Sequence, residues 1–200
     1  MSGAFPTTAR QPSSPVIIRS VTPTRVSTSH SMKRQARSRG AQRFGFRLSW
    51  RNLKRAEYQI IDAFLSAQRG QFENFTIILP IHSAPLGSWA GVPVVNGANQ
   101  SGRNLSVSGF AALQTVAKAG DFFKLASGAK VYKLTQDAVS DAVGIATLVF
   151  EPALIATPSN GESITSTNVP FTVALASDMQ ESPVRSGGTY DIDVDVVEDV

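Results

Sequence analysis

The fold is decided by residues 43–51, which read Arg43-Phe44-Gly45-Phe46-Arg47-Leu48-Ser49-Trp50-Arg51. Aromatic and aliphatic side chains alternate here with basic or small ones. A period of two residues predicts a β-strand with one buried face and one solvent-facing face. Arg43, Arg47 and Arg51 then share the solvent-facing side.

A complementary stretch lies near the other end of the chain, at Tyr190-Asp191-Ile192-Asp193-Val194-Asp195-Val196. Here acids alternate with apolar residues, so Asp191, Asp193 and Asp195 are expected on one solvent-facing side. Opposite charges on neighbouring strands are mildly favourable, by about 0.2–1 kcal/mol per pair. We therefore expect the two strands to pair in one antiparallel sheet, and the chain between them to be inserted into that domain.

The charge distribution separates the two ends of the chain. Twelve of the nineteen Lys and Arg residues lie between Arg10 and Arg55, and no Asp or Glu precedes Glu57. The 200 residues contain no cysteine, which excludes disulfides, thiol nucleophiles and thiolate metal sites. No run of about 20 apolar residues occurs, so we expect no membrane partner.

One long helix is predicted after the basic strand. Its apolar stripe falls at helical spacing, at Leu53, Ala56, Ile60, Ile61, Phe64 and Leu65. Asn52 suits the N-cap, and Gly70 suits a left-handed C-terminal cap, so the helix spans about 53–69. Residues 75–79 follow as a buried strand that stops at Pro80.

The fold class is therefore mainly β (α+β). Residues 1–15 are rich in Pro, Ser and Thr and are expected to form a flexible N-terminal arm. Residues 16–84 and 179–200 are expected to form a discontinuous β-sandwich with one flanking helix. Residues 85–178, including a strand at 168–175, are expected to form an inserted small β-barrel or sandwich, because short strands recur at about ten-residue spacing.

The sequence contains few features that indicate catalysis. The two histidines, His30 and His82, lack a nucleophile-elbow pattern, and no phosphate loop or dinucleotide fingerprint is present. Asp137 and Asp141 lack the alternating ligands of a calcium loop. We predict no enzyme, no catalytic residue, no cofactor and no metal.

The basic segment 25–55 supports an alternative, a nucleic-acid-binding protein, because Lys and Arg can track phosphates and interleaved aromatics can stack on bases. Against it, the aromatics alternate with arginines and so face a core, and the acidic terminal strand offers the arginines a protein partner. We therefore consider nucleic acid an improbable partner.

The order of elements resembles the minor tail and distal tail proteins of phages. The similarity lies in the helix at 56–69, the following Gly70-Gln71-Phe72-Glu73-Asn74-Phe75 and the apolar strand ending at Pro80. A small β-domain that recurs in phage tail and baseplate proteins is resembled by residues 119–123, 130–137, 144–148 and 150–154.

The resemblance implies a non-enzymatic ring subunit, commonly hexameric, at the junction of tail tube and tail tip or baseplate, with residues 16–84 and 179–200 as its ring-forming domain. It implies other tail proteins (tube and hub) as partners, a place in the virion, and assembly in the bacterial host cytoplasm. We expect the charged side chains to act in charge pairing or at interfaces, at Arg37, Arg39, Arg43, Arg47, Arg51, Asp191, Asp193 and Asp195.

Overall fold

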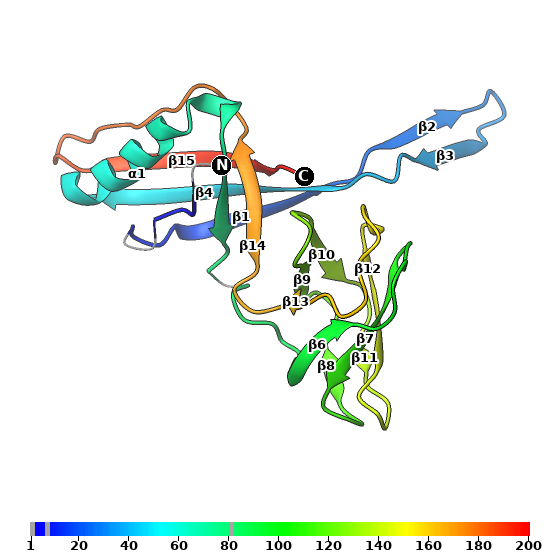
Figure 1. Cartoon of the computed structure of the whole chain (residues 1–200). Coiled ribbons are helices and arrows are strands. Elements are labelled where there is room, and N and C mark those ends of the chain that lie inside the picture. The colour runs from blue at the N-terminus through cyan, green and yellow to red at the C-terminus, as the bar shows by residue number, and fades with distance from the viewer. Residues whose placement is uncertain (1–2, 7–8, 81) are drawn as a thin grey trace. The chain divides into compact units, whose positions relative to one another are not determined.

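The computed structural model describes residues 3–6, 9–80 and 82–200 (Figure 1). The chain divides into two compact units. Unit 1 comprises Met1–Ile77 and Thr172–Asp199, and unit 2 comprises Ile78–Phe171 with Val200. Strands dominate both units and α1 (Arg55–Ala67) is the long helix of the described residues, so the predicted mainly β fold class is confirmed.

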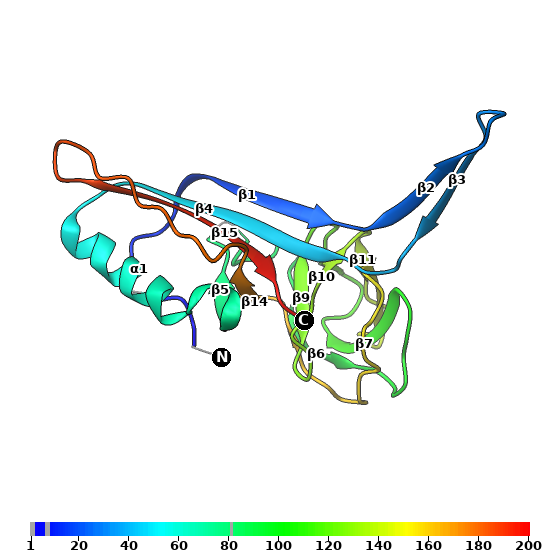
Figure 2. The same cartoon turned by 90° about the horizontal axis from the view of Figure 1, so that it is seen from above.

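Unit 1 is built on a five-stranded sheet in the order β1-β4-β15-β14-β5 (Figure 2). The strands are β1 (Ser13–Val21), β4 (Arg43–Leu53), β15 (Tyr190–Glu198), β14 (Pro170–Leu175) and β5 (Asn74–Ile78). β15 pairs antiparallel with β4, so the predicted pairing of the basic and acidic strands is confirmed. The sheet buries the alternate residues Phe44, Phe46, Leu48 and Trp50 of β4.

The placement of the strand at 168–175 in the inserted domain was wrong. β14 pairs with β15 through Val173, Ala174 and Leu175, and therefore completes the sheet of unit 1. Its apolar side chains Val173 and Leu175 are buried there. The compact units accordingly divide at 77/78 and 171/172, whereas the sequence suggested 84/85 and 178/179.

Helix α1 packs on the apolar side of this sheet through aromatic contacts. The Tyr58 ring stacks on Tyr190 of β15 at 4.2 Å between centroids, and Phe64 meets Phe75 of β5 edge-on at 5.2 Å. Ile61 and Leu65 are buried, while Ile60 of the predicted stripe is 40% exposed. The stripe therefore covers a narrower arc than the sequence suggested.

The predicted N-cap was also wrong. Lys54 occupies the N-cap position, and its backbone N–H donates to the Glu57 carboxylate at 2.9 Å. Asn52 instead lies in β4 with a φ of 55°, and its N–H donates to Asp191. At the far end Arg69 and Gly70 both adopt positive φ, so the helix ends in left-handed residues as expected near Gly70.

The predicted arm 1–15 was placed too far along the chain, because β1 already begins at Ser13, and the described residues before it pack within unit 1. Residues 1–2 and 7–8 are outside the described residues. The Phe5 N–H donates to the Thr76 carbonyl at 2.8 Å, and the Thr76 N–H donates to the Gly3 carbonyl. The Phe5 ring stacks on Trp50 at 5.6 Å. The segment therefore covers the free side of edge strand β5.

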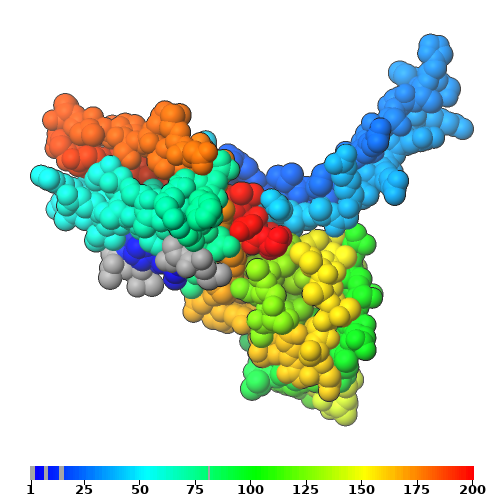
Figure 3. Space-filling view, turned by 45° about the horizontal axis from the view of Figure 1, so that its top comes forward, coloured from blue at the N-terminus to red at the C-terminus, as the bar shows by residue number. Residues whose placement is uncertain are grey.

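The basic segment forms a separate antiparallel hairpin of β2 (Thr24–Thr28) and β3 (Arg34–Ser38). All ten of these strand residues are exposed. In the space-filling view of Figure 3, the blue atoms of this part of the chain project as an arm from the rest of unit 1.

Unit 2 contains a six-stranded sheet in the order β13-β9-β10-β12-β7-β6. In chain order the strands are β6 (Gly91–Val95), β7 (Asn104–Phe110), β9 (Phe122–Leu125), β10 (Val131–Leu134), β12 (Ala146–Glu151) and β13 (Ile164–Thr165), and a two-stranded sheet joins β8 (Thr115–Ala117) to β11 (Ala138–Val139). A bridge between Val94 and Ser163 brings the two ends of the larger sheet together, so it is nearly closed as a barrel. Its core clusters Trp89, Phe123, Tyr132 and Phe150.

Across the part of the chain that the structure describes, the helices are too short or too polar to span a bilayer.

Candidate interaction surface

The solvent-facing side of the unit 1 sheet carries a network of ion pairs. Register places Asp195 of β15 opposite Arg47 of β4. The Arg47 guanidinium donates from Nη2 to Asp195 Oδ2 at 2.7 Å and from Nε to Oδ1 at 3.1 Å, and Arg19 of β1 donates to the same Oδ1 at 3.0 Å. The hydrogen bonds from Arg47 lower the pKa of Asp195 below its usual range. Three neighbouring strands are thus joined by one carboxylate.

Asp193 has a second arginine partner. Arg51 Nη2 donates to Asp193 Oδ1 at 2.8 Å, and the Ser49 hydroxyl donates to the same oxygen. Partial burial acts to raise the pKa of Asp193, but the hydrogen bonds from Arg51 and Ser49 outweigh it and the pKa is lowered. Four of the eight predicted residues (Arg47, Arg51, Asp193 and Asp195) are therefore paired with one another inside one protomer.

Asp191 is not on the solvent-facing side where the alternation placed it. The register between β15 and β4 shifts between Tyr190 and Ile192, and Asp191 is only 7% exposed. Its Oδ2 accepts a hydrogen bond from Arg185 Nη2 at 2.6 Å, and its Oδ1 accepts one from the Asn52 N–H at 2.9 Å. These hydrogen bonds lower the pKa of Asp191, and the one from Arg185 has the largest effect. Asp191 therefore anchors the loop before β15.

Sequence reasoning missed two members of this network. Arg19 lies on the same side of β1 as Ile17 and Val21, two residues away in either direction, so no alternation of charged and apolar residues marked it in the sequence. Arg185 lies in an irregular loop, where no periodicity marks a partner.

The remaining predicted residues, Arg37, Arg39 and Arg43, lie on the hairpin and at the start of β4. All three are exposed, and within the described residues none of them has an ion-pair partner. They are available for contacts with another molecule, in contrast to Arg47 and Arg51.

A hollow of about 510 Å³ lies in unit 1 where β1 and β4 leave the hairpin. Its wall is mainly apolar, with Val21, Phe44 and Val196 beside Arg19 and Arg43. Gly45 carries no side chain on this side of β4, which leaves the hollow open. It is large enough for an apolar side chain of a partner protein.

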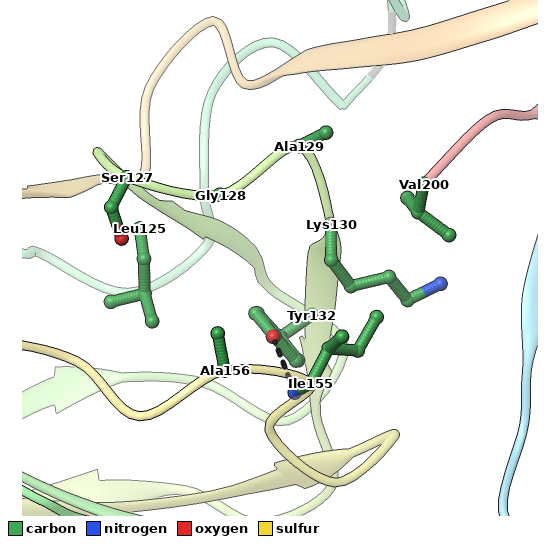
Figure 4. A pocket seen from close by; sticks show the side chains of 9 residues that line it. All are labelled: Leu125, Ser127, Gly128, Ala129, Lys130, Tyr132, Ile155, Ala156 and Val200. Atoms are coloured by element: carbon green, nitrogen blue, oxygen red, sulfur yellow. Dashed lines mark hydrogen bonds between the residues drawn. The ribbon is translucent and has the colours of Figure 1, made fainter.

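Unit 2 has a smaller pocket of about 110 Å³, lined in part by Leu125, Tyr132, Ile155 and Ala156 (Figure 4). The Ile155 N–H donates to the Tyr132 hydroxyl at 3.3 Å. Ligand pockets usually measure about 300–1,000 Å³. We therefore assign this pocket no binding role.

The two histidines belong to different units of the chain. His30 lies exposed at the hairpin tip, and the His82 ring meets Phe122 edge-on at 5.5 Å. Among the described residues no group of three or more His, Asp or Glu side chains is arranged to hold a metal ion.

Comparison with known proteins bears on the family that the sequence resembles. Residues 81–169, which fall within unit 2, match the family model of the distal tail protein pb9, B domain. Over 151 residues the chain is 28% identical to distal tail protein pb9 of Escherichia phage T5, covering 75% of this chain and 73% of that protein. The predicted resemblance to the phage distal tail family is confirmed, and the similarity supports a structural role in a phage tail.

Proposed function

We propose that this chain is a ring subunit, hexameric in the assembled state, at the junction between the tail tube and the tail tip or baseplate of a phage. The observation that carries the proposal is the similarity to distal tail protein pb9 over about three quarters of both chains. In this role the chain acts by shape and contact, without catalysis, inside the virion. Tube and hub proteins are its partners, and assembly takes place in the host cytoplasm.

The two edges of the unit 1 sheet support a head-to-tail contact between copies. Edge strand β5 is covered by the chain's own residues 3–5, whereas within the described residues no strand pairs on the outer side of β1. β1 exposes Ile17, Ile18 and Val21 by 38%, 37% and 60%. Unpaired edge strands with apolar side chains readily add a strand from another chain. A contact between unlike surfaces closes into a ring when its rotation allows.

The proposed edge contact is tested by placing a charge on β1. Val21→Lys is expected to prevent ring formation, because a lysine on an edge strand opposes strand addition. Val139→Lys is the matched control, since Val139 is 63% exposed on unit 2. Light scattering measures the molar mass of both full-length variants, with and without purified tail tubes. Val139→Lys should assemble like the wild-type chain, whereas Val21→Lys should not. If Val21→Lys and the wild-type chain had equal molar masses on tubes, β1 would not be part of the interface between copies.

The alternative predicted from sequence, nucleic-acid binding through the whole of residues 25–55, has lost part of its support. Arg47 and Arg51 of that segment are engaged with Asp195 and Asp193, and the aromatics of β4 are buried. Within the described residues, the cations of the hairpin and Arg43 form no ion pair.

A further inference from the structure

The hairpin holds the net positive charge of the whole chain. Residues 22–42 contain five Lys or Arg and no Asp or Glu. The other residues contain fourteen basic and fifteen acidic side chains, a net charge of −1 against the +4 of the full chain. The excess charge is therefore concentrated in one exposed ribbon.

The register of the hairpin gathers these cations on one face. Arg25 of β2 lies directly opposite Arg37 of β3. The two-residue period of a strand puts Lys33 and Arg39 on the same side as Arg37. Between them on this face lie only neutral polar side chains, Ser27 and Gln35. We call this surface, formed by Arg25, Lys33, Arg37 and Arg39, the basic face.

The basic face has no counter-charge within the protomer. In the described chain none of its four cations forms an ion pair. Like charges directly opposite each other on paired strands are unfavourable, and a two-stranded hairpin is marginally stable alone in water. A bound polyanion would relieve both problems. Backbone hydrogen bonds already shape the ribbon, from the Arg39 N–H to the Pro23 carbonyl and from the Ser29 N–H to the Lys33 carbonyl.

We propose that the basic face is a binding site for the phosphodiester backbone of duplex DNA. Arginine suits phosphate because its guanidinium can donate two parallel hydrogen bonds. A two-stranded β-ribbon also fits the width of the major groove. The basic face carries no apolar or aromatic side chain, which the cores of protein interfaces favour. A second copy of the chain is a poor partner, since outside the hairpin it has almost no net negative charge.

This inference corrects one step of the sequence argument and goes beyond the proposed ring role. The acidic terminal strand was expected to neutralise the arginines. It does so for Arg19, Arg47 and Arg51, but it leaves the hairpin uncompensated. The basic face therefore contributes electrostatic affinity without sequence recognition.

The test is a salt titration of binding to a fluorescein-labelled 24-base-pair duplex, followed by anisotropy with the full-length chain. Four phosphate contacts predict a slope of log K against log salt of about −3.6, which is a loss of roughly 150-fold between 50 and 200 mM salt. Arg25→Gln with Arg37→Gln should halve the slope to about −1.8 and reduce the same loss to about 12-fold. Circular dichroism should be unchanged, because both positions are exposed.

The control is Arg55→Gln with Arg69→Gln, which removes the same charge from the first residue of helix α1 and from Arg69, which follows the helix and pairs with Glu73. It should keep the slope of the wild-type chain. Equal effects of the two double variants would overturn the proposal in favour of non-specific attraction. Polyglutamate should displace the labelled duplex less effectively than unlabelled duplex of equal total charge. Equal displacement by the two competitors would also overturn the proposal, since the partner would then be an acidic protein surface. Absence of duplex binding at 50 mM salt would do the same.

Discussion

Removal of the Asp121 carboxylate is the sharpest single test of how unit 2 is held together. This side chain is 4% exposed and accepts four hydrogen bonds. Its donors are the N–H groups of Leu86 at 2.7 Å and of Gly87 and Lys118 at 3.0 Å each, and the indole Nε1 of Trp89 at 3.0 Å. One carboxylate thus fixes the segment that leads into β6 against the turn before β9.

The expected cost of Asp121→Ala follows from these four donors. Each buried donor left without an acceptor costs about 1–3 kcal/mol, and water entering beside the exposed Leu86 would recover part of the loss. We expect the free energy of unfolding of unit 2 to fall by about 3–5 kcal/mol. Asp121→Asn keeps one acceptor oxygen and should cost about half as much.

Urea unfolding and hydrogen–deuterium exchange measure this effect. Exchange should accelerate in the segment holding the Leu86 and Gly87 amides, which lose their acceptor. Asp137→Ala is the control, because Asp137 is exposed and accepts from only the Ala119 N–H and the Lys118 ammonium. A loss below about 1 kcal/mol for Asp121→Ala would refute the assignment of Asp121 as the anchor.

Two further predictions concern pH and backbone conformation. The folded-state pKa values of Asp195 and Asp191 are lowered, so their contribution to stability is present above the unfolded-state pKa and is lost as pH falls through the lower folded values. The midpoint of unfolding of the wild-type chain should therefore decrease at pH values below about 4, and the decrease should be smaller for Asp195→Asn. Equal decreases in the two proteins would count against the ion-pair network around Asp195. Gly109 has a φ of +89°, and an added Cβ would lie 2.2 Å from the Val92 carbonyl oxygen. Gly109→Ala should lower the free energy of unfolding by about 2 kcal/mol in thermal unfolding, with Gly128→Ala as a nearly neutral control. A neutral Gly109→Ala would contradict the close approach of Val92 in β6 to Gly109.

The strands of unit 1 were predictable because their signal is local. The alternation of Phe44, Phe46 and Trp50 with arginines defines which face is buried, and the charge of β15 selects β4 as its partner. The sheet to which residues 168–175 belong was not predictable, because the sequence of a short apolar strand does not indicate which strand it pairs with.

The interaction surface was predictable only in part. Opposite charges at a two-residue period pointed to Arg47 with Asp195 and to Arg51 with Asp193. The burial of Asp191 depends on a register shift and on Arg185 from an irregular loop, and neither leaves a periodic signal. The sequence of the basic, Ser-rich residues 25–40 is compatible with either a loop or a twisted edge hairpin, and the structure shows that β2 and β3 pair with each other as a hairpin.

The most direct test of the proposed ring is the molar mass of the full-length chain, measured by light scattering at low and high salt and again on purified tail tubes. The account predicts a closed assembly of six times the 21.3 kDa chain on the tubes. It also predicts that high salt weakens the assembly only slightly, because exposed ion pairs contribute about 0–1 kcal/mol each and apolar edge contacts dominate. A 21.3 kDa protomer under every condition, tubes included, would contradict the ring.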